Sequence, residues 1–291
     1  MTTPAEAPLE APDLPYVDPD RYADGRRRGR RNALIASVST VVFFGLLVAA
    51  ITSAPGWPAV QESFFSWDAA VAAWPEVISA FVLNIKIFLI AEVVILVFSL
   101  LIALARGLRG PVFLPLRILA TMHVDFFRGV PTILLILLLG FGIPALRLPG
   151  VPSSVLVWGT IALILSYSAY VSEVYRAGIE SVHPSQRAAA RSLGLSSLQA
   201  TRYVVLPQAV RRVVPPLLND FIALQKETAL VSILGPVEVL RAAQIEVSAN
   251  FNYTPYVVAA LLFVLLTLPL TRLTDWLQQR SARRRSASGV S

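Results

Sequence analysis

Apolar residues gather into long runs, and most of the charge lies in the shorter stretches between them. A run of about 20 predominantly apolar residues is the length that crosses a lipid bilayer as a helix. We therefore predict an all-α integral membrane protein with six transmembrane helices. The expected spans cover residues 33–52, 81–105, 131–146, 155–175, 214–234 and 256–273.

Composition agrees with this pattern, since 55% of the residues are hydrophobic and only 15% are charged. A soluble domain of this size would need more polar surface. The net charge of +7 comes mainly from arginines beside the apolar runs. That placement is typical of the inner ends of membrane spans and argues against nucleic acid as a partner. Cysteine is absent, which excludes a disulfide framework and thiolate metal sites.

The distribution of basic residues predicts the orientation, because loops on the cytoplasmic side are enriched in arginine and lysine. An arginine cluster precedes the first span without a convincing signal-peptide cleavage site. We expect residues 1–31 to be a disordered cytoplasmic leader, 32–76 an anchor and outer loop, 77–277 the main membrane domain, and 278–291 a basic tail that contacts anionic lipid. Six crossings then place both termini in the cytoplasm of a multi-pass protein of the cell membrane.

The loop between the fourth and fifth spans predicts two short helices. Pro184 suits the first position of a helix, and Gly194 suits a left-handed cap at its end. Ser196 and Gln199 have the spacing of a capping box, and Pro207 is expected to break the second helix before the next span. Such a sharply bounded helix on the cytoplasmic side could lie in a groove of a partner protein.

This loop resembles the permease signature of binding-protein-dependent ABC importers. That signature has Glu-Ala-Ala, then Gly, then an aliphatic residue before Leu-Pro; here Ala188 stands at the usual Glu position. The residues at the signature positions are Ala188, Ala189, Ala190, Gly194, Val204, Leu206 and Pro207.

Further segments are similar to the polar amino acid branch of that family. The segment 126–131 resembles its Phe-Arg-Gly-Thr-Pro motif, and residues 166–179 and 219–228 resemble two of its helices. The match covers about residues 80–280, so the main domain, 77–277, resembles an ABC importer permease domain.

The resemblance implies a type I ABC importer-like bundle with a cytoplasmic coupling-helix loop. The implied partners are ABC ATPase subunits, an extracytoplasmic solute-binding protein, a second permease copy or a related permease, the lipid bilayer and an amino acid substrate. The chain itself would be no enzyme and would hold no cofactor, with ATP and Mg on the partner ATPase. The residues implied in coupling to the ATPase are Gln186, Ala188, Ala189, Ala190, Arg191, Leu193, Gly194, Leu206 and Pro207.

The sequence independently indicates that ATP binds to another chain, because the expected phosphate-binding motif is missing. A Walker phosphate loop needs Gly-Lys-Ser/Thr. The chain has only two lysines, Lys86 and Lys226, and neither follows a glycine.

Charged residues inside spans are costly and are candidates for function. Glu173 and Arg176 have the spacing of an ion pair along a helix, with a substrate contact as the alternative role of Glu173. Lys226 requires an internal partner such as Glu227, Glu92 or Glu173, or else belongs to the pathway. The candidate substrate-pathway residues are Arg128, Pro131, Tyr170, Glu173, Asn219, Asp220, Lys226 and Glu227.

Neither a catalytic residue nor a metal site is expected. His123 and His183 lack further ligands at metal-binding spacing and are interpreted as structural. Three alternatives stay open: the same importer architecture carrying another solute such as an osmolyte, an intramembrane enzyme, and a secondary transporter. The identity of the amino acid and the choice between homodimer and heterodimer are not determined by the sequence.

Overall fold

The structure is a computed structural model that describes residues 19–108 and 110–287, with side chains over 31–108 and 110–280. In these ranges it is helical and contains no strand. The chain divides into two compact units, one up to Val60 and one from Gln61 onward, which are described separately. The elements are α1 (Pro19–Thr52), α2 (Trp57–Phe64), α3 (Trp67–Gly107), η1 (Pro111–Phe113), α4 (Leu114–Gly129), α5 (Thr132–Ala145), α6 (Val155–Glu180), α7 (Pro184–Ser192), α8 (Ser197–Ala200), η2 (Thr201–Val205), α9 (Leu206–Glu227), η3 (Thr228–Leu234), α10 (Val239–Asn250) and α11 (Thr254–Ala287).

The first unit is dominated by α1, whose side chains from residue 32 to residue 52 are all exposed. The helix begins at Pro19 and so includes residues 19–31 of the expected leader. Arginine and alanine are good helix formers, and they extend the apolar helix toward the N-terminus. The rest of the expected leader, residues 1–18, lies outside the described residues.

Four of the described helical stretches are long and apolar enough to cross a membrane: Arg31–Thr52, Trp57–Gly107, Val155–Glu180 and Thr254–Arg280. Two further pairs of helices meet this condition together but are bent, by 105° between Pro111–Gly129 and Thr132–Ala145 and by 52° between Ser197–Leu234 and Val239–Asn250. Counting each bent pair as one crossing gives six spans. The fold is therefore an all-α membrane bundle, and each expected span lies in one of these stretches.

The second span is part of a much longer helix than the sequence suggested. Helix α3 has 41 residues, about twice the length that crosses a bilayer. It begins where the Ser66 hydroxyl accepts a hydrogen bond from the Ala69 amide, and it contains Pro75. Much of the expected outer loop is helical, because Ser66 caps the helix and an alanine-rich segment follows it.

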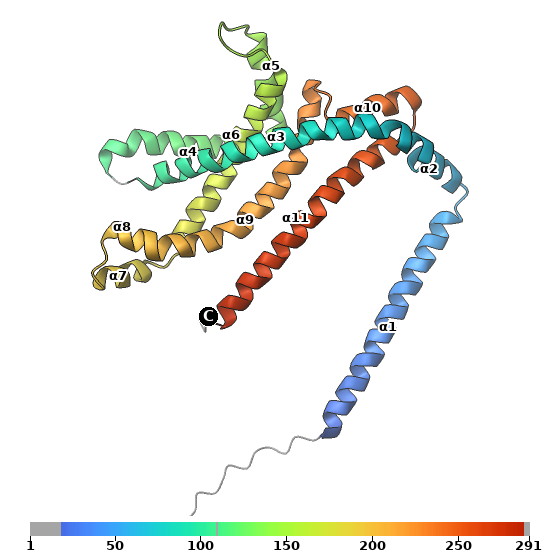
Figure 1. Ribbon diagram of the computed structural model, residues 1–291, viewed down its shortest axis with the longest axis horizontal. Helices are drawn as coiled ribbons and strands as arrows, with labels where there is room; N and C mark the ends of the chain where they lie inside the picture. The colour runs from blue at the N-terminus through green and yellow to red at the C-terminus, as the bar shows by residue number, and fades with distance from the viewer. Residues whose placement is uncertain (1–18, 109, 288–291) are drawn as a thin grey trace, which may run out of the picture. The chain divides into compact units, whose positions relative to one another are not determined.

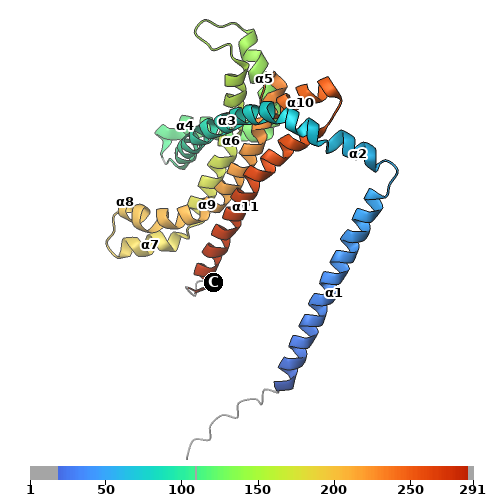
Figure 2. The same ribbon diagram turned by 45° about the vertical axis from the view of Figure 1, so that its right-hand side comes forward.

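The second unit has its main core where α6 packs against α3, α5 and α9. Its fully buried side chains include Ile95 of α3, Ile136 of α5, Leu163 of α6 and Leu224 of α9. Figures 1 and 2 show α9 lying between α6 and α11. In both views α7 and α8 lie at one end of this unit, and α10 lies at the other.

A buried polar cluster joins α3 to the segment between α9 and α10; it is called the Asn84 cluster and consists of Asn84, Thr228 and Glu238. The Asn84 side-chain amide donates to Thr228 Oγ1 (3.2 Å) and to Glu238 Oε2 (2.9 Å). Its oxygen accepts from the Val239 amide at 3.0 Å, and Glu238 Oε1 accepts from the Arg241 amide at 2.8 Å. All three cluster side chains are buried, so they fix the register of α10 against α3.

The loop between α6 and α9 contains the predicted short helices. Pro184 starts α7, and Gly194 follows it with φ of +86° in the left-handed region. The amides of Leu195 and Gly194 donate to the carbonyls of Ala190 (3.2 Å) and Arg191 (3.0 Å), which is the Schellman ending of a helix. The expected left-handed cap is confirmed.

The capping box is also confirmed. The Ser196 hydroxyl accepts from the Gln199 amide at 3.2 Å, and Gln199 Oε1 accepts from the Ser196 amide at 2.8 Å.

Pro207 does not break the second helix, contrary to our expectation. Helices α8 and α9 are joined by the π-helical segment η2, and Pro207 lies in the first turn of α9. Proline lacks an amide hydrogen and its ring crowds the carbonyl four residues earlier. The wider π turn before Pro207 accommodates that missing bond without ending the helix.

Candidate functional site

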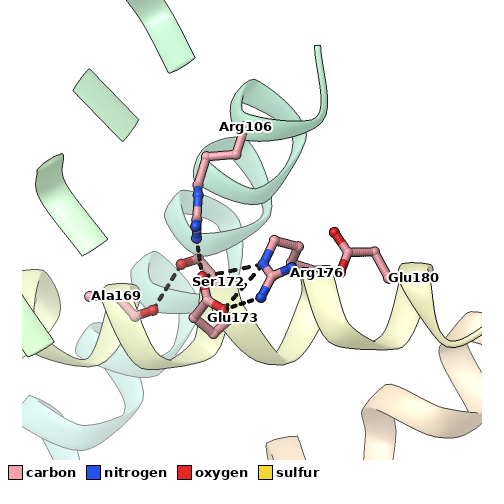
Figure 3. Close-up of polar contacts among 6 residues, drawn as sticks. All are labelled: Arg106, Ala169, Ser172, Glu173, Arg176 and Glu180. Carbon is pink, nitrogen blue, oxygen red and sulfur yellow. Dashed lines mark hydrogen bonds and ion pairs between the residues drawn. The ribbon is translucent and has the colours of Figure 1, made fainter. Parts of the chain in front are cut away.

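The main ion-pair group of the second unit is centred on Glu173 of α6. Its carboxylate accepts hydrogen bonds from Arg106 at the end of α3 and from Arg176 one helical turn away, with 2.7 Å between Arg176 Nη2 and Glu173 Oε2. Arg176 Nη1 also donates to Glu180 Oε2 at 2.5 Å. Figure 3 shows the two guanidinium groups converging on Glu173.

This arrangement confirms the predicted pair between Glu173 and Arg176 and adds a second partner. No local sequence pattern paired Arg106 with Glu173. Placing the ends of the second and fourth spans at the same membrane level would have brought it near Glu173. Both carboxylate oxygens are engaged, so Glu173 first of all joins α3 to α6.

A cavity of about 500 Å³ lies beside this group between α6 and α9. Arg128 lies with its guanidinium carbon 5.7 Å from the centre of the Tyr170 ring, and the Tyr170 hydroxyl donates to the Arg128 carbonyl at 3.4 Å. Asp220 contributes a buried oxygen, Oδ2, that has no hydrogen-bond partner within the described part of the chain. The charged and aromatic side chains of the lining are those of Arg128, Tyr170, Glu173, Arg212 and Asp220.

Gly178 sets how closely α6 and α9 approach beside the cavity. A Cβ atom at this position would lie 2.0 Å from Cγ2 of Val213. Val213 is buried and β-branched, so it has little freedom to move away. Only glycine fits here without displacing α9, and Arg212 holds the same contact by donating to the Ser181 carbonyl.

The structure divides the candidate pathway residues into two sets. Arg128, Tyr170, Glu173 and Asp220 line the cavity, whereas Pro131, Asn219, Lys226 and Glu227 do not. Arg212 lines it and was not a candidate. It precedes Asp220 by eight residues on α9, a spacing that places both on nearly the same face.

Lys226 is exposed, and over residues 31–108 and 110–280 it forms no ion pair. Glu173, one of the expected partners of Lys226, is instead bound by Arg106 and Arg176, so that pairing is wrong. A long lysine stem can carry its ammonium group away from apolar surroundings without a fixed partner.

Both histidines form hydrogen bonds within the protein. His123 Nε2 lies 3.0 Å from the Ser168 hydroxyl. The centre of the His123 ring lies 4.6 Å from the centre of the Phe127 ring. His183 Nδ1 accepts from the Ser185 amide at 3.2 Å and thereby caps α7. These contacts agree with the structural interpretation of both residues.

The residues implied in coupling are arranged around α7. Ala190 is buried, whereas Gln186, Ala189 and Leu193 are exposed at helical spacing on one face, with Leu193 84% exposed. Ala188 and Arg191 lie on another face, with Arg187. Leu206 and Pro207 are exposed at the start of α9, and Gly194 ends α7 as described above.

Comparison with known proteins gives consistent matches. Residues 113–283 match the family described as "Binding-protein-dependent transport system inner membrane component". The probable glutamine ABC transporter permease protein GlnM of Bacillus subtilis is 35% identical over 66% of this chain and 88% of its own length. The arginine transport system permease protein ArtQ of the same organism is 30% identical over 70% of this chain and 92% of its own. A solved amino acid ABC transporter, crystallised with histidines, has a TM-score of 0.67 and 32% identity, covering 74% of this chain and 98% of that one.

Proposed function

The chain belongs to the family of binding-protein-dependent transport system inner membrane components, and we propose that it imports amino acids as the membrane-spanning permease subunit of an ATP-driven transporter. The α7–α8 end faces the cytoplasm in this proposal, with both termini on that side. A separate ATPase supplies the energy, and an external solute-binding protein delivers the cargo. The excess of exposed arginines around α7, α8 and the start of α9 supports this orientation.

The main structural support for an amino acid as the cargo is the cavity between α6 and α9. A free amino acid has an ammonium and a carboxylate group on one carbon, so its site needs charges of both signs. Asp220 contributes a carboxylate to the cavity wall, and Arg128 contributes a guanidinium that is free of ion pairs within the described residues. A volume of about 500 Å³ accommodates such a molecule. The relatives named for glutamine and arginine transport support the same cargo class.

The exposed face of α7 is the surface that we assign to the ATPase. This face carries the exposed side chains of Gln186, Ala189 and Leu193, which no other described part of the second unit buries. Leu193 gives this face a large apolar side chain that a groove in the partner would bury. Movement of the ATPase would pass through α7 to α6 and α9, which border the cavity.

Uptake by proteoliposomes tests the proposal directly. We expect ATP-dependent uptake of one class of labelled amino acids when the chain is reconstituted with its ATPase and solute-binding protein, and none when the ATPase is left out. Uptake of an osmolyte in place of every amino acid would refute the cargo, and uptake without the ATPase would refute the coupling.

Substitution of Arg128 tests the cavity within the same assay. Arg128→Gln removes a charge that faces the cargo carboxylate, so we expect the concentration for half-maximal uptake to rise about tenfold. Arg272→Gln is the matched control, since Arg272 is exposed on α11 away from the cavity. Equal effects of the two substitutions would contradict this role of Arg128.

Gly194 tests the coupling surface. Its φ of +86° disfavours any other residue, although a Cβ atom added there would meet no other atom within 4 Å. Gly194→Ala should therefore strain the end of α7 by about 1 kcal/mol and lower uptake per ATP hydrolysed. Gly142→Ala, at an equally open helical position with ordinary φ, should leave that ratio unchanged. An unchanged ratio in both variants would exclude α7 from coupling.

A further inference from the structure

A second hollow of the molecule lies at the α7–α8 end, outside the cargo cavity. It has a volume of about 1200 Å³ and is bordered by the ends of α3 and α6, by α7 and by α8 with η2. It is called the basic groove here, because three guanidinium groups line it against one carboxylate. These groups belong to Arg176, Arg187, Arg191 and Glu180.

The positive charge of the basic groove is incompletely neutralised by the protein. Arg176 is engaged with Glu173 and Glu180. Arg187 and Arg191 form no ion pair within residues 31–108 and 110–280, and both are exposed. They are four residues apart on α7, so their side chains are neighbours on one face of the helix. Two adjacent free guanidinium groups form a suitable site for a phosphate group.

The other wall of the basic groove is apolar. It includes Leu104 at the end of α3 and the buried side chains of Val182 and Val205. Leu104 also ends a stripe of exposed apolar side chains along α3, which comprises Val93, Val97, Leu101 and Leu104 at 64%, 58%, 57% and 51% exposure. The spacing of four, four and three residues places them on one face of the helix. An acyl chain could follow this stripe out of the groove.

The face of α7 that lines the basic groove differs from the face assigned to the ATPase. Pro184, Arg187, Ala188 and Arg191 line the groove, at the spacing of one helical face. Gln186, Ala189 and Leu193 point to a different side of the same helix. Ala188 and Arg191, which the resemblance implied in coupling, thus lie on the groove face and are assigned to the groove in this proposal.

We propose that the basic groove binds an anionic phospholipid of the cytoplasmic leaflet, with its phosphate on Arg187 and Arg191 and an acyl chain along the α3 stripe. Clusters of basic residues at the cytoplasmic end of membrane helices are suited to anionic headgroups. The inference shares with the proposed function the cytoplasmic placement of α7, but it is independent of the cargo. A bound lipid would connect α3 to α7 across the groove.

Lipid binding to the purified full-length chain tests this proposal without ATPase, receptor or cargo. Native mass spectrometry would compare phosphatidylglycerol with phosphatidylcholine of identical acyl chains. We expect tighter binding of phosphatidylglycerol, and a roughly twenty-fold loss of that affinity in Arg187→Gln/Arg191→Gln, because each basic residue near anionic lipid contributes about a factor of five. Binding of phosphatidylcholine should not change.

Two further variants make the result specific. Arg202→Gln/Arg211→Gln removes two exposed arginines from the same end of the molecule but outside the groove, and should retain phosphatidylglycerol affinity within about twofold. Ala188→Glu keeps every arginine and adds a carboxylate to the groove face, so it should weaken phosphatidylglycerol binding about fivefold. Thermal unfolding of each variant would verify that it is folded.

Several outcomes would overturn the proposal. Equal binding of the two lipids, or equal losses in the two double variants, would exclude a specific site. Displacement of phosphatidylglycerol by the same concentration of inorganic phosphate would assign the arginines to a free anion. Unchanged lipid selectivity in Arg187→Gln/Arg191→Gln would exclude these two arginines from lipid binding. Because no uptake is measured, failure here leaves the amino acid proposal standing.

Discussion

The Asn84 cluster and the cavity between α6 and α9 both gather polar side chains, but they expose them differently. The side chains of the cluster are buried, whereas those of Arg128, Tyr170 and Arg212 at the cavity are exposed and that of Asp220 is half-buried. In the Asn84 cluster both functional atoms of the asparagine and both carboxylate oxygens of Glu238 have partners between 2.8 and 3.2 Å. Beside the cavity, Asp220 has a buried oxygen, Oδ2, that has no partner among the described residues. A buried polar group is costly unless it is hydrogen-bonded.

The difference separates two uses of polarity in a membrane bundle. A fully bonded cluster stabilises one arrangement of helices, and it offers nothing to a ligand. A cavity lined by charged side chains, as we propose for the cargo site, leaves bonds for a ligand to form, at some cost to the stability of the empty protein. Substitutions in the first region should therefore lower stability, and substitutions in the second should lower uptake.

The largest stability loss is expected from Asn84→Ala. The change removes three hydrogen bonds, leaves Glu238 partly unpartnered and frees the Val239 amide. Each buried group left without a partner costs roughly 1–3 kcal/mol, so we expect a loss of about 3 kcal/mol. Thermal unfolding of the purified protein would measure it.

Asn219→Ala is the control for this prediction, because Asn219 is exposed on α9. Its unfolding temperature should lie close to that of the unchanged protein. If Asn84→Ala unfolded at the same temperature as the control, the cluster would have no special structural role, and the comparison between the two regions would fail.

A smaller loss is expected from Gly178→Ala, which acts on the packing beside the cavity. The added methyl group would overlap Val213 and push α9 away, at a cost of about 1–3 kcal/mol. The double variant Gly178→Ala/Val213→Ala should recover most of the stability, because the shorter side chain makes room.

Gly142→Ala, where a methyl group meets no atom within 4 Å, should lose little stability. A rescue would show that the close approach of α6 and α9 is the cause. Failure of the second substitution to rescue the first would mean that Gly178 is needed for another reason.

The sequence predicts those features of the structure that depend on residues close together in the chain. Hydrophobic runs predicted the spans, and local capping chemistry predicted the ends of α7 and the start of α8, because both depend on residues close together in the chain. The pair between Glu173 and Arg176 was predictable for the same reason. The bond from Arg106 to Glu173 was not, since it depends on how α3 packs against α6.

The failed expectations have the same origin. Pro207 was expected to break a helix, but the π-helical turn before it absorbs the missing hydrogen bond. Lys226 was expected either to have an internal partner or to belong to the pathway. It forms no ion pair over residues 31–108 and 110–280, and its exposure depends on which face of α9 meets the bundle. The Asn84 cluster joins residues more than 140 positions apart, and no local pattern marked it.

The smallest stability change is expected from Asp220→Asn, and this prediction tests the comparison most sharply. The two side chains have nearly the same shape, and the affected oxygen has no partner to lose in the described protein. We expect the free energy of unfolding to change by at most about 0.5 kcal/mol. Uptake should nevertheless weaken, with the half-saturating concentration rising about tenfold or more, because the charged bond to the cargo ammonium that we propose would be replaced by a neutral one. Asp275→Asn, on the exposed surface of α11, should change neither quantity. If Asp220→Asn instead lowered stability as much as Asn84→Ala and left the affinity for cargo intact, Asp220 would be a structural residue, and the incompletely bonded oxygen could not be taken as the mark of a binding site.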